Sequence, residues 1–167
     1  MGGMEGLQAM QLLLKEYPQA AREKTLDGWL PLHLVARYMG GMEGLQAMQL
    51  LLAEYPQAAK EKISDGWLPL HLVARYMGGA EGLQAIQLLL AEYPQAAREK
   101  TGNGLLSIHI ICENNNGANL EMVRALLSAY PEGAGVTDIT NPCVRAAHFN
   151  CLPDDAIDFL LRAQKGE

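Results

Sequence analysis

The feature that most constrains this chain of 167 residues is an internal repeat. Residues 1–38 and 39–76 are identical at 34 of 38 positions, and residues 77–114 match the second copy at 24 of 38. The remainder, from Asn115 onward, reads as a decayed copy of the same unit. A period of this length is typical of proteins in which supersecondary units stack side by side and share one core.

Each copy contains two helical patterns. A longer helix is expected over about 43–54, because one helix face gathers the apolar side chains Leu45, Met48, Leu52 and Tyr55. Pro56 ends that helix, since proline restricts the residue before it and lacks an N–H. A shorter helix is expected over 69–76, with Pro69 suited to the first helical position. Neither helix can bury its apolar face alone, so neighbouring units must stack.

The pattern predicts the order of helices along the whole chain. A longer helix over about 4–17 comes first, without a shorter helix before it. Shorter helices are expected near 30–38, 68–76, 106–114 and 141–149. A last longer helix is expected over about 154–164, and its many charged side chains suit a unit whose outer side faces water.

Two segments carry a family resemblance. Residues 27–36 read Asp-Gly-Trp-Leu-Pro-Leu-His-Leu-Val-Ala, and residues 65–74 repeat them. This string resembles the ankyrin-repeat motif D-G-x-T-P-L-H-x-A-A, and it is similar to the long-period variant with DGWLPLH fingers of algal and protist ankyrin-repeat proteins. The resemblance implies an all-α fold, an ankyrin-like α-solenoid of stacked helix pairs with short finger loops, a 38-residue period and about four and a half repeats.

The sequence also departs from the ankyrin motif. The period is five residues longer than the usual 33 or so, and most of the extra length falls between the two helices of a unit. Leu30 and Leu68 replace the motif threonine, so the hydroxyl that would cap the shorter helix is missing. We expect one domain over 1–167, divided into an orphan outer helix and loop (1–25), three repeats (26–63, 64–101 and 102–136) and a C-terminal capping repeat (137–167).

One histidine recurs in each of three copies, as His33, His71 and His109. Successive copies in a helical stack should lie about 10 Å apart, which is too far to share a proton or a metal ion. The family resemblance implies a structural role, in which the ring bridges backbone groups of neighbouring repeats.

No catalytic or cofactor motif stands out. The strongest candidate is a metal site built from Cys143, His148 and Cys151 together with Cys112, but this spacing matches none of the usual zinc patterns. Core packing explains these cysteines better. The glycine-rich strings lack the Gly-Lys-Ser/Thr of a phosphate loop. We therefore expect no enzyme, no metal and no cofactor.

Charge and hydropathy exclude other classes of protein. The net charge is −6 and the thirteen Lys and Arg are scattered, which argues against nucleic-acid binding. No apolar stretch suggests a membrane helix, and the first residues lack the basic region of a signal peptide. Three cysteines are too few for a disulfide framework. We expect an intracellular protein, cytoplasmic or nuclear.

The resemblance implies a non-enzymatic protein-interaction scaffold that binds a protein partner through the finger loops and the concave face of the inner helices. Its contact positions map to Leu26, Asp27, Trp29, Arg37, Tyr38, Ser64, Asp65, Trp67, Arg75, Tyr76, Gly102, Asn103, Leu105, Glu113 and Asn114. Trp, Tyr and Arg are enriched in binding hot spots. Packing is the alternative for Trp29, Trp67 and Tyr38, whereas Arg37 and Arg75 are expected to make contacts, because arginine is seldom fully buried.

Two further hypotheses concern the whole chain. It could be a structural or engineered repeat array, or a fragment of a larger ankyrin protein, with no dedicated partner. The apolar side of the first helix could also join two chains into a homodimer through the N-terminal repeat, because this helix is nearly identical to one expected in the core.

Overall fold

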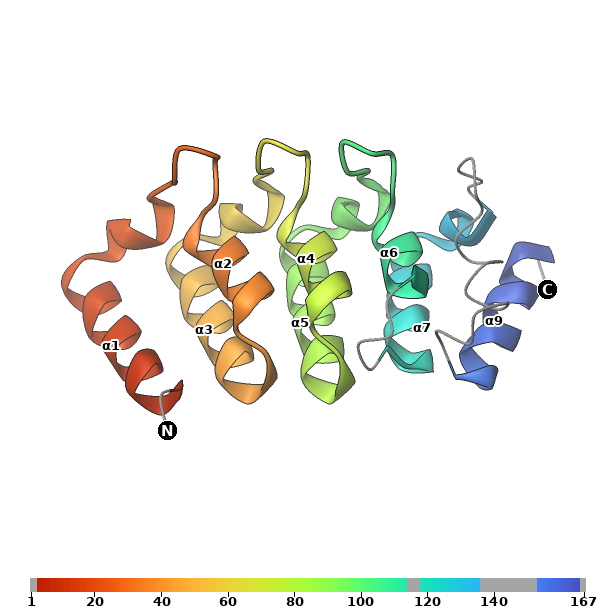
Figure 1. Cartoon of the computed structure of the whole chain (residues 1–167), viewed down its shortest axis with the longest axis horizontal. Coiled ribbons are helices and arrows are strands. Elements are labelled where there is room, and N and C mark those ends of the chain that lie inside the picture. The colour runs from red at the N-terminus through yellow and green to blue at the C-terminus, as the bar shows by residue number, and fades with distance from the viewer. Residues whose placement is uncertain (1–2, 114–117, 136–152, 166–167) are drawn as a thin grey trace.

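The computed structural model describes residues 3–113, 118–135 and 153–165. Within these ranges the chain forms α-helices and short 3₁₀ helices and no strand, so the protein is all-α. The helices lie side by side in a row, from α1 (Gly3–Glu16) at one end to α9 (Asp154–Lys165) at the other (Figure 1). In the described ranges, no helix is both long enough and apolar enough to cross a membrane.

Long and short helices alternate along the chain. The long helices that follow α1 are α3 (Gly41–Glu54), α5 (Gly79–Glu92) and α7 (Leu120–Ala129). The short ones are α2 (Pro31–Tyr38), α4 (Pro69–Tyr76) and α6 (Ser107–Glu113). The bounds of α1, α2, α3, α4, α6 and α9 agree with the sequence-based expectations to within two residues. The helix expected over 141–149 lies outside the described residues.

A 3₁₀ helix follows each of the first four long helices, and the sequence analysis did not predict it. These are η1 (Pro18–Arg22), η2 (Pro56–Lys60), η3 (Pro94–Arg98) and η4 (Pro131–Gly135). Tyr55 leaves the helical region at φ −143° and ψ 79°, because the proline after it disfavours the helical conformation. Pro56 then begins the tighter turn, and Ala58 and Ala59 on that turn are buried.

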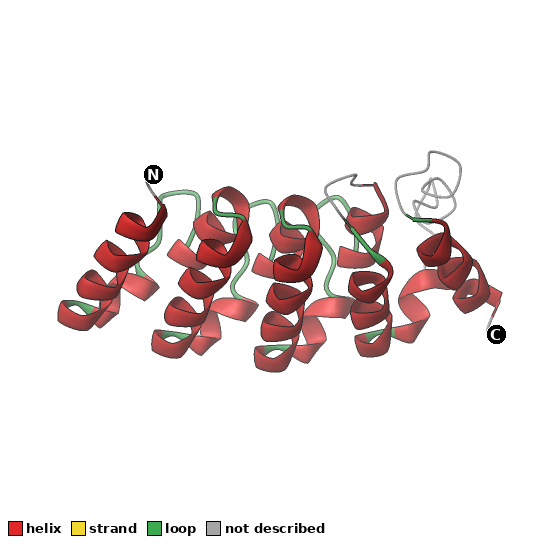
Figure 2. Cartoon of the chain, turned by 90° about the horizontal axis from the view of Figure 1, so that it is seen from below, coloured by secondary structure: helices red, strands yellow, loops and turns green. Residues whose placement is uncertain are grey.

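The helices pack in two rows. Short helix α2 contacts α4 and α4 contacts α6, while α1, α3, α5, α7 and α9 contact one another in that order. Each short helix also contacts the long helix that follows it (Figures 1 and 2). Apolar side chains from both rows form one buried cluster, including Leu32, Met48, Leu70 and Ile86. The core therefore runs along the row and holds each helix pair against the next.

Only Met39 and Gly40 link short helix α2 to long helix α3. Helix α2 ends at Tyr38, and Met39 is extended at φ −111°. Gly41 has φ +66°, a left-handed conformation that glycine adopts readily. A Cβ on Gly44 would collide with the carbonyl of Met39, so this position also requires glycine. Tyr38, the last residue of α2, is 70% exposed, so core packing is wrong for this residue.

Candidate binding surface

Three loops project from one edge of the row, each ahead of a short helix (Figure 1). We call residues 24–30, 62–68 and 100–106 the fingers. In the first, the N–H of Thr25 donates to the carbonyl of Trp29 (2.9 Å) and the N–H of Gly28 to the carbonyl of Thr25 (2.9 Å). The tip glycines Gly28, Gly66 and Gly104 have φ of 81°, 77° and 83°. Since only glycine adopts this region without strain, the repeated Asp-Gly or Asn-Gly fixes the turn.

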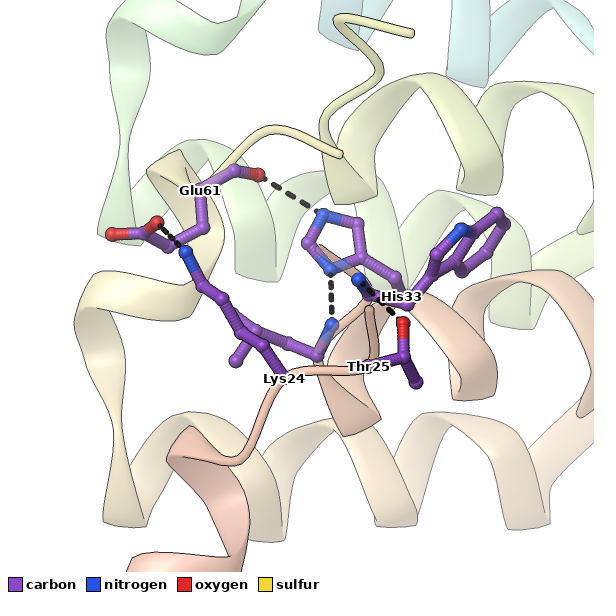
Figure 3. A network of polar contacts seen from close by, with 6 residues as sticks. Lys24, Thr25, His33 and Glu61 are labelled. Atoms are coloured by element: carbon purple, nitrogen blue, oxygen red, sulfur yellow. Dashed lines mark hydrogen bonds and ion pairs between the residues drawn. The ribbon is translucent and has the colours of Figure 1, made fainter. Parts of the chain in front are cut away.

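The recurring histidine joins a short helix to the unit that follows it (Figure 3). Nδ1 of His33 accepts a hydrogen bond from the N–H of Leu30 (3.1 Å), and Nε2 lies 3.0 Å from the carbonyl oxygen of Glu61. A carbonyl only accepts and Nδ1 is itself an acceptor here, so the proton sits on Nε2 and the ring is neutral. His71 repeats the pattern with Leu68 and Glu99, at 3.0 Å and 3.0 Å.

These hydrogen bonds satisfy the backbone N–H just before the short helix, although no side chain of Leu30 caps the first turn. Leu30 precedes the first residue of α2, where the ankyrin motif has threonine, and its N–H is satisfied by the ring of His33 three residues later. In the third copy, Nδ1 of His109 accepts from the N–H of Leu106 at 3.3 Å. All three rings are fully buried. Burial lowers the pKa of His33 and of His71 to about 4, because a charged imidazole would lose its hydration.

Neighbouring fingers are connected to one another. The carbonyl of Asp27 accepts hydrogen bonds from the hydroxyl (2.8 Å) and the N–H (3.3 Å) of Ser64. The carbonyl of Asp65 accepts from the N–H of Gly102 (2.8 Å). Ion pairs of half-exposed side chains run alongside, from Lys24 to Glu61 (2.8 Å) and from Lys62 to Glu99 (2.7 Å). The main chain of each finger is thus held, while the side chains of Asp27 and Asp65 remain exposed.

The two tryptophans lie between core and surface. Trp29 and Trp67 are half-buried and pack on the hydrophobic core. Each contacts the histidine four residues later edge to face, at centroid distances of 6.1 Å for Trp29–His33 and 6.0 Å for Trp67–His71. Both also line a pocket that opens between the first two fingers. Each tryptophan is therefore packed against the core and also partly exposed, so neither core packing nor surface contact alone describes it.

Arg37 lies beside that pocket among aromatic rings. Its Cζ is 5.4 Å from the ring centre of Trp29, 5.3 Å from that of Tyr38 and 5.3 Å from that of Tyr76. Such contacts hold a cation against an aromatic ring by electrostatic attraction. The pocket of about 180 Å³ is lined by Trp29, Arg37, Ile63, Asp65, Trp67, Leu72 and Tyr76. It brings together residues of both fingers and of both short helices.

Most of the expected contact positions lie at the surface. The exposed residues are Leu26, Asp27, Arg37, Tyr38, Ser64, Asp65, Arg75, Gly102, Asn103 and Glu113. Tyr76 and Leu105 are half-buried, like the two tryptophans. Asn114 lies outside the described residues. The sequence analysis missed Ile63 and Leu72 as pocket-lining residues. A signal for Ile63 was available, because two of the four differences between the first two copies fall in the finger, at positions 25/63 and 26/64.

Outside this surface, Cys112 is buried in the core cluster. The other members of the metal hypothesis, Cys143, His148 and Cys151, lie beyond the described residues. Among the residues that are described, no group of three His, Cys, Asp or Glu side chains is placed to hold a metal ion.

Comparison with protein families and with curated proteins finds no match for this chain.

Proposed function

We propose that this chain is an ankyrin-type α-solenoid and that it binds a protein partner through its fingers and the adjoining face of its short helices. The observation that supports this best is the pocket between the first two fingers. It combines three large aromatic side chains with Arg37, the residue types that dominate binding hot spots. The hydrogen-bonded fingers present these groups on a fixed frame, which lowers the entropy lost on binding.

The fold offers this surface without further rearrangement. The histidine bonds, the finger bonds and the buried core all lie behind the exposed side chains and tie neighbouring units together. A solenoid of this type gains an extended binding surface from repetition. The alternative is a structural array without a dedicated partner. It would account for the buried core equally well, but it gives the aromatic pocket no role.

A charge-reversal experiment separates the two. Arg37→Glu with Arg75→Glu should abolish capture of specific partners from an extract of the source cells. The matched control is Arg22→Glu with Arg98→Glu. These arginines also lie over tyrosine rings, 5.2 Å from Tyr55 and 5.1 Å from Tyr130, but on the 3₁₀ helices η1 and η3 and outside the pocket.

Both double variants change the charge equally. The finger-side variant removes the three ring contacts of Arg37, and the control removes one ring contact from each of its arginines. Each such contact is worth about 0.5–1 kcal/mol at an exposed site. We expect similar, small losses of melting temperature in both and loss of capture only in the finger-side variant. If the unmodified chain captures nothing specific, or if both variants capture the same proteins as the unmodified chain, the binding proposal fails.

A further inference from the structure

We propose that the pocket beside Arg37 accepts an acidic segment of the protein partner, with an apolar side chain in the pocket and a neighbouring carboxylate on the Arg37 guanidinium. This inference rests on the proposed function and specifies the chemistry of the partner.

Aromatic rings hold the guanidinium of Arg37 in place, but no ion pair among the described residues neutralises its charge. Aromatic rings contact it at 5.3–5.4 Å. In the described part of the chain, the ion pairs are Lys24–Glu61, Lys62–Glu99 and Arg124–Glu121, and none includes Arg37. Ring contacts do not use N–H donors, of which a guanidinium has five in a planar fork that matches a carboxylate. The rings therefore preorganise a cation whose hydrogen-bonding capacity is available to a ligand.

The rest of the pocket determines what accompanies the carboxylate. Ile63, Trp67 and Leu72 supply apolar walls. The volume of about 180 Å³ is below the roughly 300–1,000 Å³ of sites for drug-sized molecules, and it suits a single apolar side chain. Trp29 and Tyr76 lie both in the pocket and on Arg37, so the apolar and charged parts of the site are continuous.

The surrounding charge favours a carboxylate over a phosphate. Asp65 lines the same pocket, and the whole chain carries a charge of −6. A phosphate monoester, which carries up to two negative charges near neutral pH, would be repelled more strongly by this field than a singly charged carboxylate. A short peptide can place one carboxylate on Arg37 and direct its backbone N–H groups toward Asp65.

The next repeat does not reproduce this site. Arg75 occupies the position of Arg37 one copy later, but the copy that follows it has Leu105 in place of Trp67 and Glu113 in place of Arg75. An acidic side chain and a missing indole make that location less suited to an acidic ligand. The acidic subsite is therefore expected beside Arg37 and not beside Arg75.

The test begins with a displayed library of short random peptides that lack tryptophan. Peptides that bind the full chain are selected from it. The chain has two tryptophans, and both line this pocket, so tryptophan emission reports on ligands that bind at this surface. We expect the selected peptides to carry Asp or Glu next to a large apolar residue and to shift the emission. Exchanging the acid for its amide should weaken binding by about tenfold or more, as expected for loss of a charge-assisted hydrogen bond.

Variants of the protein complete the test. Arg37→Met should weaken the same peptides by about tenfold or more, and Arg37→Lys should lie between. The control is Arg98→Met, on η3 and outside the pocket, which should change affinity less than about threefold. Thermal melting of each variant verifies that it is folded. Peptides that bind without an acid, without an emission shift or equally well to Arg37→Met would overturn this inference and leave the wider binding proposal standing. A failure to select any peptide would count against both.

Discussion

Nε2 of His33 lies 3.0 Å from the carbonyl oxygen of Glu61, which follows it by 28 residues in the chain. The opposite nitrogen of the same ring accepts the N–H of Leu30, so one imidazole caps its own helix and holds the next unit. His71 and Glu99 repeat the arrangement one unit later. The bond from Leu30 requires a neutral ring, since a proton on Nδ1 would face the N–H that this nitrogen now accepts.

Mild acid should therefore destabilise the stack. Burial lowers the pKa of His33 and of His71 from 6.5 to about 4, so between these values the unfolded chain binds more protons than the folded one. The free energy of unfolding is highest above about pH 6.5 and falls as pH decreases toward 4. Each histidine contributes up to about 3 kcal/mol at the rate of 1.36 kcal/mol per pKa unit.

Urea unfolding at about pH 7 and at about pH 5 measures this loss before most carboxylates titrate. His33→Gln with His71→Gln supplies the control: it should be less stable at pH 7 and should lose less on acidification. A midpoint that does not move between these pH values, or one that moves equally in the control, would contradict a neutral, buried pair of rings.

Removal of one ring should be costly. His71→Ala leaves the N–H of Leu68 and the carbonyl of Glu99 without the bonds that satisfy them in a buried setting. We expect a loss of roughly 1–3 kcal/mol in the free energy of unfolding. His109→Ala should cost less, because its bond to Leu106 is longer, at 3.3 Å, and its copy has Ser107 in place of the proline. Denaturant midpoints give the comparison, and equal small losses would refute the structural role.

The tips of the first two fingers should differ in their tolerance of alanine. Gly28 and Gly66 both have positive φ, so either substitution strains the backbone by about 1–2 kcal/mol. A Cβ on Gly66 would also lie 2.7 Å from the nitrogen of Gly102, whereas the nearest atom to a Cβ on Gly28 is 3.7 Å away. Gly66→Ala should therefore lower the melting temperature clearly more than Gly28→Ala. A reversed order would mean that the fingers are not joined as described.

Much of the described fold could be predicted from the sequence, because the repeat shows the residue pattern of each helix several times. Apolar spacing and the prolines at 31, 56 and 69 mark the helices to within two residues. The 3₁₀ turns and the capping by His33 were missed, because a cap is expected from a hydroxyl or carboxylate and Leu30 has neither. The grouping of three rings around Arg37 combines residues of two copies, and no local pattern predicts which side chains meet across that boundary.

Helices α1 and α3 have nearly identical sequences, but equivalent apolar residues are exposed in α1 and buried in α3. Leu13 in α1 is 53% exposed, whereas Leu51, at the same position of α3, is 2% exposed. Leu12 and Tyr17 are also exposed, at 65% and 48%. Helix α3 contacts α1, α2 and α5, whereas α1 contacts mainly α3 and η1. The face on α1 keeps the apolar residues of a core position without those additional neighbours, and exposed apolar patches favour association.

We therefore predict self-association through α1, most simply a two-fold pair in which the apolar faces of two copies meet. Light scattering over a wide dilution series should give a mass above the 18.2 kDa of one chain that decreases on dilution. Leu13→Glu should shift the sample toward 18.2 kDa, because a charge at the centre of the contact would be buried unpaired. Met42→Glu is the control, since Met42 is 52% exposed and lies on α3 where the next copy has alanine. A mass of one chain at every concentration, or equal behaviour of the two variants, would rule the pairing out.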